Sequence, residues 1–277
     1  MSNYLGSRFA QQLSRFEAHL RGRELSQNTI TTYLTAMRQF FQLFSNASKE
    51  NGIKYKEMLQ KQKAKPSTIN MKINAYNAYC KMLGDEKSQV KTVSARYSTT
   101  VSNVISRSQY HKLLNELKKD GNSSWYFSIK LLAVTGARVG EAVRITKRDF
   151  DNGFAEVWSK GKMRRIYIPM RFQEEAAEFY QNIRDSDPLI RNKCGKAIST
   201  RGVAYMLQSF AKRYGIDKRV MHPHAFRHLF AIEFLRKTSN LPLLSDIMGH
   251  SSVSTTAIYT RLTQEEQERI INKAIIW

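Results

Sequence analysis

Two histidines, an arginine and a tyrosine near the end of the chain are spaced like groups that could act on a phosphodiester. His224 and Arg227 stand three residues apart in H-P-H-A-F-R-H, a stretch that predicts a helix start with both side chains on one face. His250 follows a glycine, and Tyr259 comes nine residues later. The phenol of Tyr259 is the candidate nucleophile. Its ordinary pKa is about 10, so it needs a cation or a base nearby to lose its proton.

Attack on a phosphodiester gives a five-coordinate phosphorus whose equatorial oxygens gain negative charge, and fixed cationic donors must meet that charge. Arg138 and Arg227 each offer a planar guanidinium that can bond two oxygens and stays protonated. His224 is the candidate for moving the proton of the nucleophile. Lys160, at the tip of a predicted hairpin, could protonate the leaving sugar oxygen. His250 could donate a hydrogen bond to a non-bridging oxygen.

Most of these residue types also have an ordinary structural interpretation. An isolated arginine such as Arg138 in T-G-A-R is more often a surface or salt-bridge residue. A tyrosine such as Tyr259, at the end of an apolar helical stretch, usually belongs to a core or an interface. Lys160 and Lys162 could serve only as contacts to backbone phosphates, as part of a basic face. Order and spacing along the chain therefore have to decide between these interpretations.

The histidine cluster allows a second kind of site, a metal centre. His222, His224 and His228 lie within one short stretch. However, no Asp, Glu or Cys accompanies them at ligand spacing, and Arg227 lies in their midst. The sequence therefore favours an anion site over a metal site, and we expect no cofactor.

The charge of the chain indicates a polyanionic partner. In 277 residues there are 45 Lys and Arg against 23 Asp and Glu, a net charge of +22. Residues 1–100 contribute +10 and the remainder +12, so the excess is spread over both halves. This distribution favours a long basic groove over a basic tail, and double-stranded DNA is the expected partner. The alternative is a surface that is merely well solvated.

The remaining composition predicts a soluble protein of the cytoplasm. Cys80 and Cys194 are too few and too distant for a disulfide framework or a zinc site, which fits a reducing compartment. No apolar run is long enough to span a bilayer, and residues 1–6 do not resemble a signal peptide. No contact with a membrane is expected.

The first 95 residues predict an all-α unit. Apolar residues recur at helical spacing from Phe9 to Leu20, and a second helix is expected after Ser26, with Asn28 as a possible cap. Further helices are expected over residues 55–61 and 66–82. Basic side chains on the outer faces of these helices, together with the hairpin lysine, are candidate DNA contacts: Arg38, Lys65, Lys72 and Lys162. Residues 84–105 lose periodicity and predict a linker, with a boundary near residue 95.

The second half predicts a mostly helical domain with one small antiparallel sheet. Strands are expected over residues 154–159 and 164–168, on either side of the hairpin turn at 160–162. Arg138 is expected at a junction between two helices. The predicted helices cover residues 106–117, 125–134, 137–141, 172–183, 200–214, 225–235, 243–248, 254–259 and 264–276.

In its motifs the chain resembles the tyrosine recombinase (phage integrase) family over nearly its whole length. Four motifs carry the resemblance: T-G-A-R-V-G-E-A at 135–142, S-K-G-K at 159–162, H-A-F-R-H at 224–228 and M-G-H-x8-Y-T at 248–260. By position, the catalytic residues of the family fall on Arg138, Lys160, His224, Arg227, His250 and Tyr259, with Glu141 as a supporting acid. The departures, Phe226 for leucine, Gly140 for serine and Ser239-Asn240 for a glycine turn, remove no chemical group.

The resemblance implies a mainly α, two-domain clamp. It consists of an N-terminal SAM-like helical core-binding domain (1–95) and a mixed α/β catalytic domain (106–277) that ends in a helix over 264–277. It also implies site-specific recombination in integration, excision or resolution of DNA, as in mobile genetic elements, without metal or ATP.

In such a reaction Tyr259 would form a 3′-phosphotyrosyl link, and a homotetramer would exchange strands between two sites through a Holliday junction. The protein could be a monomer without DNA, and it would be associated with the nucleoid. Two alternatives remain: an enzyme like a type IB topoisomerase, and a catalytically silent, sequence-specific DNA-binding protein.

Overall fold

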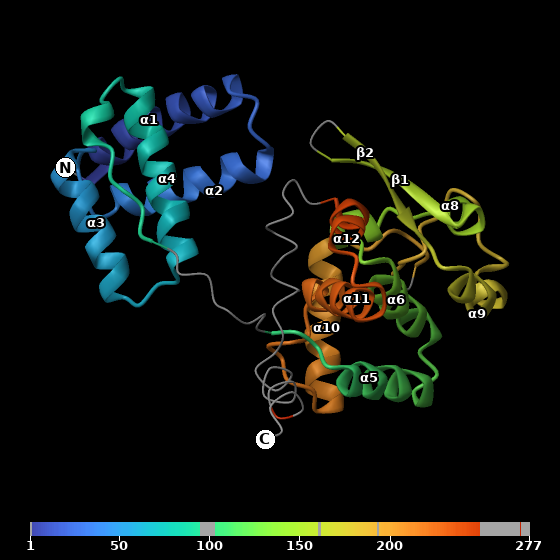
Figure 1. Cartoon of the computed structure of the whole chain (residues 1–277). Helices are drawn as coiled ribbons and strands as arrows, with labels where there is room; N and C mark the ends of the chain where they lie inside the picture. The colour runs from blue at the N-terminus through green and yellow to red at the C-terminus, as the bar shows by residue number, and fades with distance from the viewer. Residues whose placement is uncertain (1, 95–102, 160–161, 193, 250–271, 273–277) are drawn as a thin grey trace. The chain divides into compact units, whose positions relative to one another are not determined.

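The computed structural model describes residues 2–94, 103–159, 162–192, 194–249 and 272. The chain divides into two compact units, Met1–Tyr97 and Ser98–Trp277 (Figure 1). The helices predicted over 254–259 and 264–276 lie outside the described residues. No helix in the described ranges is long and apolar enough to cross a membrane.

Helices packed around an aromatic core make up the first unit. They are α1 (Ser2–Gly22), α2 (Gln27–Phe41), α3 (Lys49–Lys61) and α4 (Pro66–Met82). α2 packs against both α1 and α4. The rings of Phe16, Phe40, Tyr55, Tyr76 and Tyr79 are fully or almost fully buried, and several of them meet edge to face. This dense aromatic packing fixes the helices with respect to one another.

Serine caps set the starts of α2 and α3. Ser26 Oγ accepts from the backbone N–H of Thr29 at 3.3 Å, so the cap of α2 is Ser26, and Asn28 lies inside the first turn. Ser48 Oγ accepts from the N–H of Asn51 at 3.3 Å. α3 therefore begins well before the predicted residue 55, because this cap satisfies an amide of the first turn.

The start of the predicted linker is packed against the first unit. A short 3-10 helix, η1 (Glu86–Ser88), follows α4, and the chain after η1 then runs back along α4. Asn77 bonds both the N–H and the C=O of Val90, at 2.8 and 2.9 Å, and Asn70 bonds the same two groups of Val93 at the same distances. Val90 is buried. The connection between the units therefore begins only beyond these contacts.

The described residues of the second unit form helices and a two-stranded antiparallel sheet. β1 (Phe154–Ser159) pairs with β2 (Lys162–Tyr167) in the register Val157 opposite Arg164. Its helices are α5 (Arg107–Lys119), α6 (Ser123–Thr135), α7 (Val139–Ala142), α8 (Lys147–Asn152), α9 (Met170–Tyr180), α10 (Thr200–Tyr214), α11 (Pro223–Thr238) and α12 (Leu241–Met248). The short helix α8 was not predicted; a capping box between Thr146 and Asp149 starts it.

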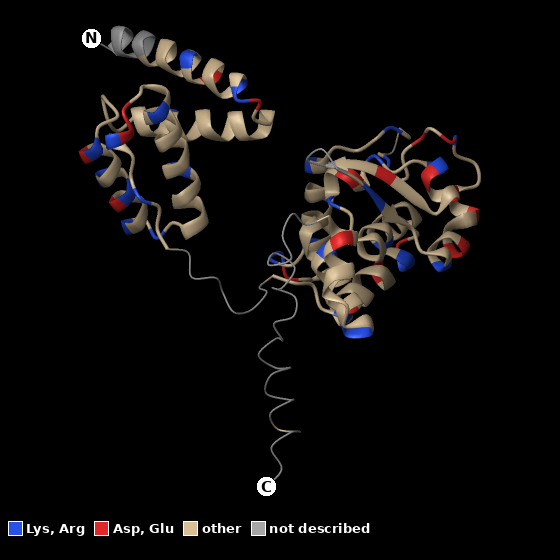
Figure 2. Cartoon of the chain, turned by 45° about the horizontal axis from the view of Figure 1, so that its top comes forward, with Lys and Arg blue, Asp and Glu red and all other residues tan. Residues whose placement is uncertain are grey.

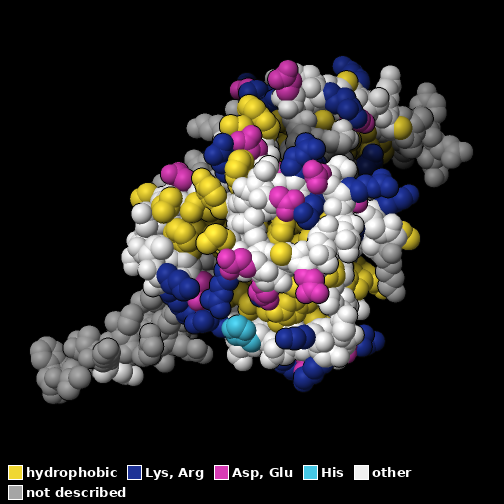
Figure 3. Space-filling model, turned by 90° about the vertical axis from the view of Figure 1, so that its right-hand side faces the viewer, with side chains coloured by type: hydrophobic (Ala, Val, Ile, Leu, Met, Phe, Trp, Pro, Cys, Tyr) yellow, Lys and Arg dark blue, Asp and Glu magenta, His cyan; other side chains and the backbone are white. Residues whose placement is uncertain are grey.

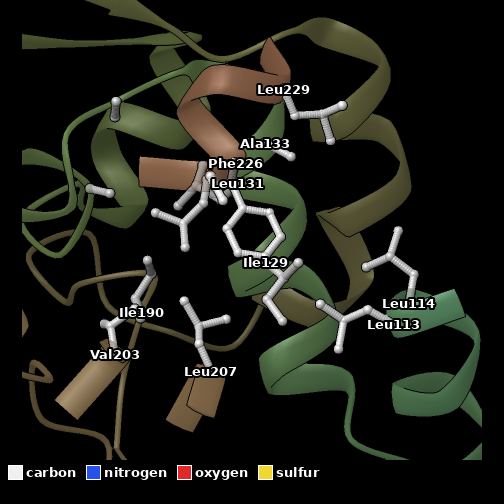
Figure 4. Packing of buried hydrophobic residues seen from close by; sticks show 14 of the residues in the cluster. Leu113, Leu114, Ile129, Leu131, Ala133, Ile190, Val203, Leu207, Phe226 and Leu229 are labelled. Atoms are coloured by element: carbon white, nitrogen blue, oxygen red, sulfur yellow. The ribbon is translucent and has the colours of Figure 1, made fainter. Parts of the chain in front are cut away.

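α6 lies at the centre of the second unit and packs against α5, α9 and α11. Figure 4 shows Ile129 and Leu131 of α6 beside Phe226 of α11, with Leu207 of α10 nearby. All four side chains are buried. Apolar residues of the neighbouring helices therefore surround α6 on several sides.

The two faces of the β1–β2 hairpin differ. Ala155 and Ile166 are buried on the inner face, which also carries Arg164. On the outer face, Trp158 and Met163 are exposed and directly opposite each other. Figure 3 shows hydrophobic side chains reaching the surface of this unit among charged ones. The residues on the inner face of the hairpin therefore contact the core and the neighbouring helices.

Candidate active site

The end of α6 and the start of α7 place Arg138 beside Glu141. α6 ends at Gly136 in the left-handed conformation (φ 59°), and a Cβ there would lie 2.4 Å from a ring carbon of Phe230. Arg138 then caps α7, as the predicted helix junction required. Glu141 accepts from the backbone N–H of Arg138 at 2.8 Å and from its Nη1 at 3.0 Å. The tight turn therefore holds the guanidinium and the carboxylate together.

The first turn of α11 carries the second arginine. His222 caps the helix by accepting the N–H of Ala225 at Nδ1 (3.2 Å), and Pro223 is its first residue. His224 is exposed, and Arg227, one turn further on, is buried. Arg227 donates from Nη1 to the carbonyl of Gly136 at 2.6 Å, so α11 is tied to the end of α6.

Three arginines meet at the C-terminal end of α12. Three successive carbonyls there, those of residues 247, 248 and 249, each accept from a different guanidinium: Arg164 Nη1 at 2.6 Å, Arg227 Nη2 at 2.7 Å and Arg138 Nη2 at 2.9 Å. The last carbonyls of a helix have no partner within the helix, and the dipole favours cations at this end. The arrangement satisfies these carbonyls and brings the three guanidiniums together.

Arg164 was not among the predicted site residues. It lies on the inner face of β2, and its Nη2 donates to Glu141 Oε2 at 2.6 Å. Strand alternation could have signalled it, because Arg164 shares its face with the buried Ile166 and a charge in that position requires partners. Backbone carbonyls are among those partners, and they leave no mark in a sequence.

The charges of the site lower the pKa of Glu141, and burial together with these charges lowers the pKa of His224. Burial of Glu141 favours its neutral form, but the N–H of Arg138 and the guanidiniums of Arg164 and Arg138 outweigh burial and lower its pKa. The pKa of His224 is also lowered, by partial removal of the ring from water and then by the charges of Arg227, His222 and Arg138. A neutral imidazole can accept a proton, as the predicted role of His224 requires.

The structure brings together four of the predicted residues: Arg138, Glu141, His224 and Arg227. Arg138 is half-buried and Arg227 is buried, so Arg138 is the more open of the two to a ligand. The other three predicted catalytic residues, Lys160, His250 and Tyr259, lie outside the described residues. In the sequence, Lys160 directly follows β1 and His250 directly follows Gly249.

The predicted DNA contacts lie on different parts of the chain. Arg38 on α2 and Lys65 at the start of α4 are exposed. Lys72 is half-buried, with Nζ 6.0 Å from the centre of the Tyr55 ring. The side chain of Lys162 lies outside the described part of the hairpin. Contact of these four residues with DNA stays a prediction.

No group of three or more His, Cys, Asp or Glu side chains in the described ranges could hold a metal ion. His224 and His228 have ring centres 6.4 Å apart. Burial, and then the charges of His224, His222 and Arg227, lower the pKa of His228 to about 4.

Comparison with known proteins identifies the family. Residues 103–266 match the model of the phage integrase family. The tyrosine recombinase XerA of Pyrococcus furiosus is 25% identical over 273 residues, which cover 96% of this chain and 94% of the relative. The tyrosine recombinase XerC of Staphylococcus aureus is 35% identical over 153 residues, covering 51% of this chain and 50% of the relative.

Solved structures share the fold. The integrase of the transposon Tn1549, in complex with transposon right end DNA, aligns with a TM-score of 0.72 at 16% identity, over 95% of this chain and 99% of that one. A crystal structure of XerA recombinase aligns with a TM-score of 0.54 at 24% identity, over 97% and 99% of the chains. These likenesses confirm the predicted mainly α fold with its small antiparallel sheet. The chain therefore belongs to the phage integrase family and is a tyrosine recombinase, an enzyme of site-specific DNA recombination.

Proposed function

We propose that Tyr259 attacks the scissile phosphate and that Arg138 and Arg227 stabilise the charge that develops on it. The new bond joins the phenolic oxygen to phosphorus, the bond to the 5′ oxygen breaks, and a 3′-phosphotyrosyl link remains. A 5′-hydroxyl from a partner strand then reverses the step, so the energy of the ester is kept and no cofactor is consumed. The observation that carries this proposal is the convergence of both arginines on the end of α12, from which the sequence continues to His250 and Tyr259.

The other roles follow from charge and position. His224, exposed and with a lowered pKa, accepts the phenolic proton. Lys160 donates a proton to the departing 5′ oxygen, and His250 donates a hydrogen bond to a non-bridging oxygen. Glu141 holds Arg138 in place through two hydrogen bonds.

We also propose the substrate and the assembly. The substrate is double-stranded DNA, and the enzyme works as a homotetramer on two recombination sites, through a Holliday junction, to integrate, excise or resolve DNA. Lys and Arg residues in both units (Figure 2) support a clamp around the duplex, with Arg38, Lys65, Lys72 and Lys162 as contacts. Related structures include XerH bound to difH DNA and a lambda integrase dimer bound to a core site. With DNA as its substrate, the enzyme would work in the cytoplasm at the nucleoid.

The decisive experiment compares Tyr259→Phe with Tyr205→Phe, a control at an exposed tyrosine on α10. The recognition site is first selected from random-sequence duplexes, and nicked suicide substrates then trap the covalent intermediate. We expect Tyr259→Phe to bind DNA with nearly unchanged affinity and to form no adduct, and Tyr205→Phe to form the adduct. An adduct that survives denaturant in Tyr259→Phe would refute the nucleophile. Joined products from two sites distinguish a recombinase from a topoisomerase.

A further inference from the structure

Arg164 has no part in the proposed chemistry, yet its side chain is largely buried and bonded on both terminal nitrogens. Its side chain is 11% exposed, so it is placed within the unit and not on the surface that meets solvent. Its two terminal nitrogens have different partners, the carbonyl of Ile247 and the carboxylate of Glu141, both at 2.6 Å. A planar guanidinium can bridge two such partners in a fixed geometry, which a lysine cannot do.

The partners of Arg164 coincide with those of Arg138. Arg138 is held on one side by Glu141 Oε1 and on the other by the carbonyl of Gly249. Arg164 bonds the second oxygen of the same carboxylate and a carbonyl in the same turn of α12. Gly249 also lies directly against Arg164, because a Cβ on Gly249 would be 2.4 Å from Arg164 Cδ. Arg164 therefore contacts both groups that hold the guanidinium of Arg138, the Glu141 carboxylate and Gly249.

We propose that Arg164 is a positioning residue of the recombination reaction. Its guanidinium joins β2, α7 and the end of α12, and thereby sets where Arg138 stands with respect to the phosphate. This inference rests on the proposed function, because it assumes that Arg138 meets the scissile phosphate. Arg164 touches no reacting atom and acts through Glu141 and the end of α12.

The test uses Arg164→Met, Arg164→Lys and the control Arg165→Met on the full chain, with the selected duplex as a nicked suicide substrate. Arg165 is the neighbouring residue, half exposed on the outer face, where it pairs with Glu156 at 3.1 Å. We expect Arg164→Met to lower the rate of covalent cleavage at saturating protein about a hundredfold, with DNA affinity nearly unchanged, since small misplacements cost about that much. Arg164→Lys should be almost as slow, and Arg165→Met should match the wild type. Full activity of Arg164→Lys would show that charge alone suffices and would overturn the proposal.

A substrate with sulfur in place of the 5′ bridging oxygen separates two routes of action. Sulfur leaves without a proton, so it rescues loss of a general acid but not misplacement of Arg138. We expect no rescue of Arg164→Met. Rescue would mean that Arg164 acts through the leaving-group proton, and the proposal would be wrong.

Hydrogen exchange without DNA gives a second readout that does not depend on activity. In Arg164→Met we expect amides of α12 near residues 245–249 to exchange about tenfold faster or more, because this end loses one of its three arginine donors, while α5 and α10 stay protected. Unchanged exchange at the end of α12 would overturn the proposal. A wild-type protein that forms no adduct on selected DNA would instead refute the proposed function, and exchange would still decide whether Arg164 holds this helix end.

Discussion

At the scale of single residues, the site is a set of charges that must share partners. Glu141 lies between two guanidiniums, which keep its pKa low in spite of burial. The arginines in turn satisfy backbone carbonyls that would otherwise lack donors. Removing any one charge therefore leaves another polar group unpaired, which costs about 1–3 kcal/mol when the group is buried.

Lys160 is the residue for which cleavage kinetics are most informative. We expect Lys160→Ala to slow covalent cleavage about a hundredfold or more, the usual effect of losing a positioned general acid. The substrate with a sulfur leaving group should restore the rate, which can be followed by adduct formation on denaturing gels. Lys162→Ala serves as the comparison. If Lys162→Ala shows the rescue and Lys160→Ala does not, the general acid is the other lysine of the hairpin.

The half-buried His228 predicts a loss of stability in acid. Burial, with the nearby charges of His224, His222 and Arg227, lowers its pKa to about 4. In the unfolded chain this histidine binds a proton near pH 6.5. The contribution of the neutral His228 to the free energy of unfolding is therefore complete above pH 6.5 and is lost as the pH falls toward 4. The loss is on the order of 3 kcal/mol in the free energy of unfolding. Urea unfolding of the wild type and of His228→Gln at pH 7, 6, 5 and 4 measures this loss. We expect the free energy of unfolding to depend less on pH in the variant, and the same pH dependence in both proteins would contradict the prediction.

At the scale of elements, the ends of helices carry the site. Gly136 caps the end of α6, His222 caps the start of α11, and Gly249 caps the end of α12. Gly136 and Gly249 each accept a hydrogen bond from an arginine of the site. Helix ends suit this purpose because their backbone groups are unpaired and point along the axis. Gly249 is needed twice, for its left-handed conformation and for its contact with Arg164.

A pair of glycines separates these two requirements. Gly249 and Gly215 both end helices at φ 61°, but a Cβ on Gly249 would lie 2.4 Å from Arg164, whereas on Gly215 the nearest atom is Lys112 Nζ at 3.9 Å. We expect Gly215→Ala to cost about 1 kcal/mol from conformation alone. Gly249→Ala should cost about 1 kcal/mol or more beyond that, because an arginine held by two hydrogen bonds must move. If urea unfolding shows the same loss of free energy in Gly249→Ala and Gly215→Ala, the side chain of Arg164 moves aside at no cost.

At the scale of the whole molecule, the main feature is the large positive net charge. The net charge of +22 comes from both halves of the chain, and Lys and Arg residues occur in both units (Figure 2). Such an excess destabilises a compact chain by self-repulsion, and a polyanion that lies against it removes this cost.

Binding to DNA should therefore weaken steeply with salt. Each phosphate that the protein neutralises releases counterions, so log K falls almost linearly with log salt concentration. If the protein contacts about six to ten phosphates, affinity should drop by roughly 10³–10⁵ between 50 and 200 mM salt. Fluorescence anisotropy on the selected duplex measures the slope. A flat response would contradict a duplex held by both units, whereas a shallower slope in Lys65→Ala would assign one phosphate to that residue.

The sequence by itself determined the chemical groups and the elements that carry them. Residue type and order predicted Arg138, His224 and Arg227, and helical spacing with an N-terminal proline predicted α4 at residues 66–82, as the structure has it. The prediction of α4 is confirmed because helical periodicity is a local property of the chain. The catalytic roles of Arg138, His224 and Arg227 stay predictions.

Only the tertiary structure decided what those groups contact. The packing of Val90 and Val93 along α4 depends on asparagine bonds to backbone groups far along the chain. The role of Arg164 depends on carbonyls at residues 247–249, which every residue type possesses, and on the register that turns Arg164 toward Glu141. Contacts with backbone atoms carry no residue signature, and therefore only the folded chain shows three arginines at the end of one helix.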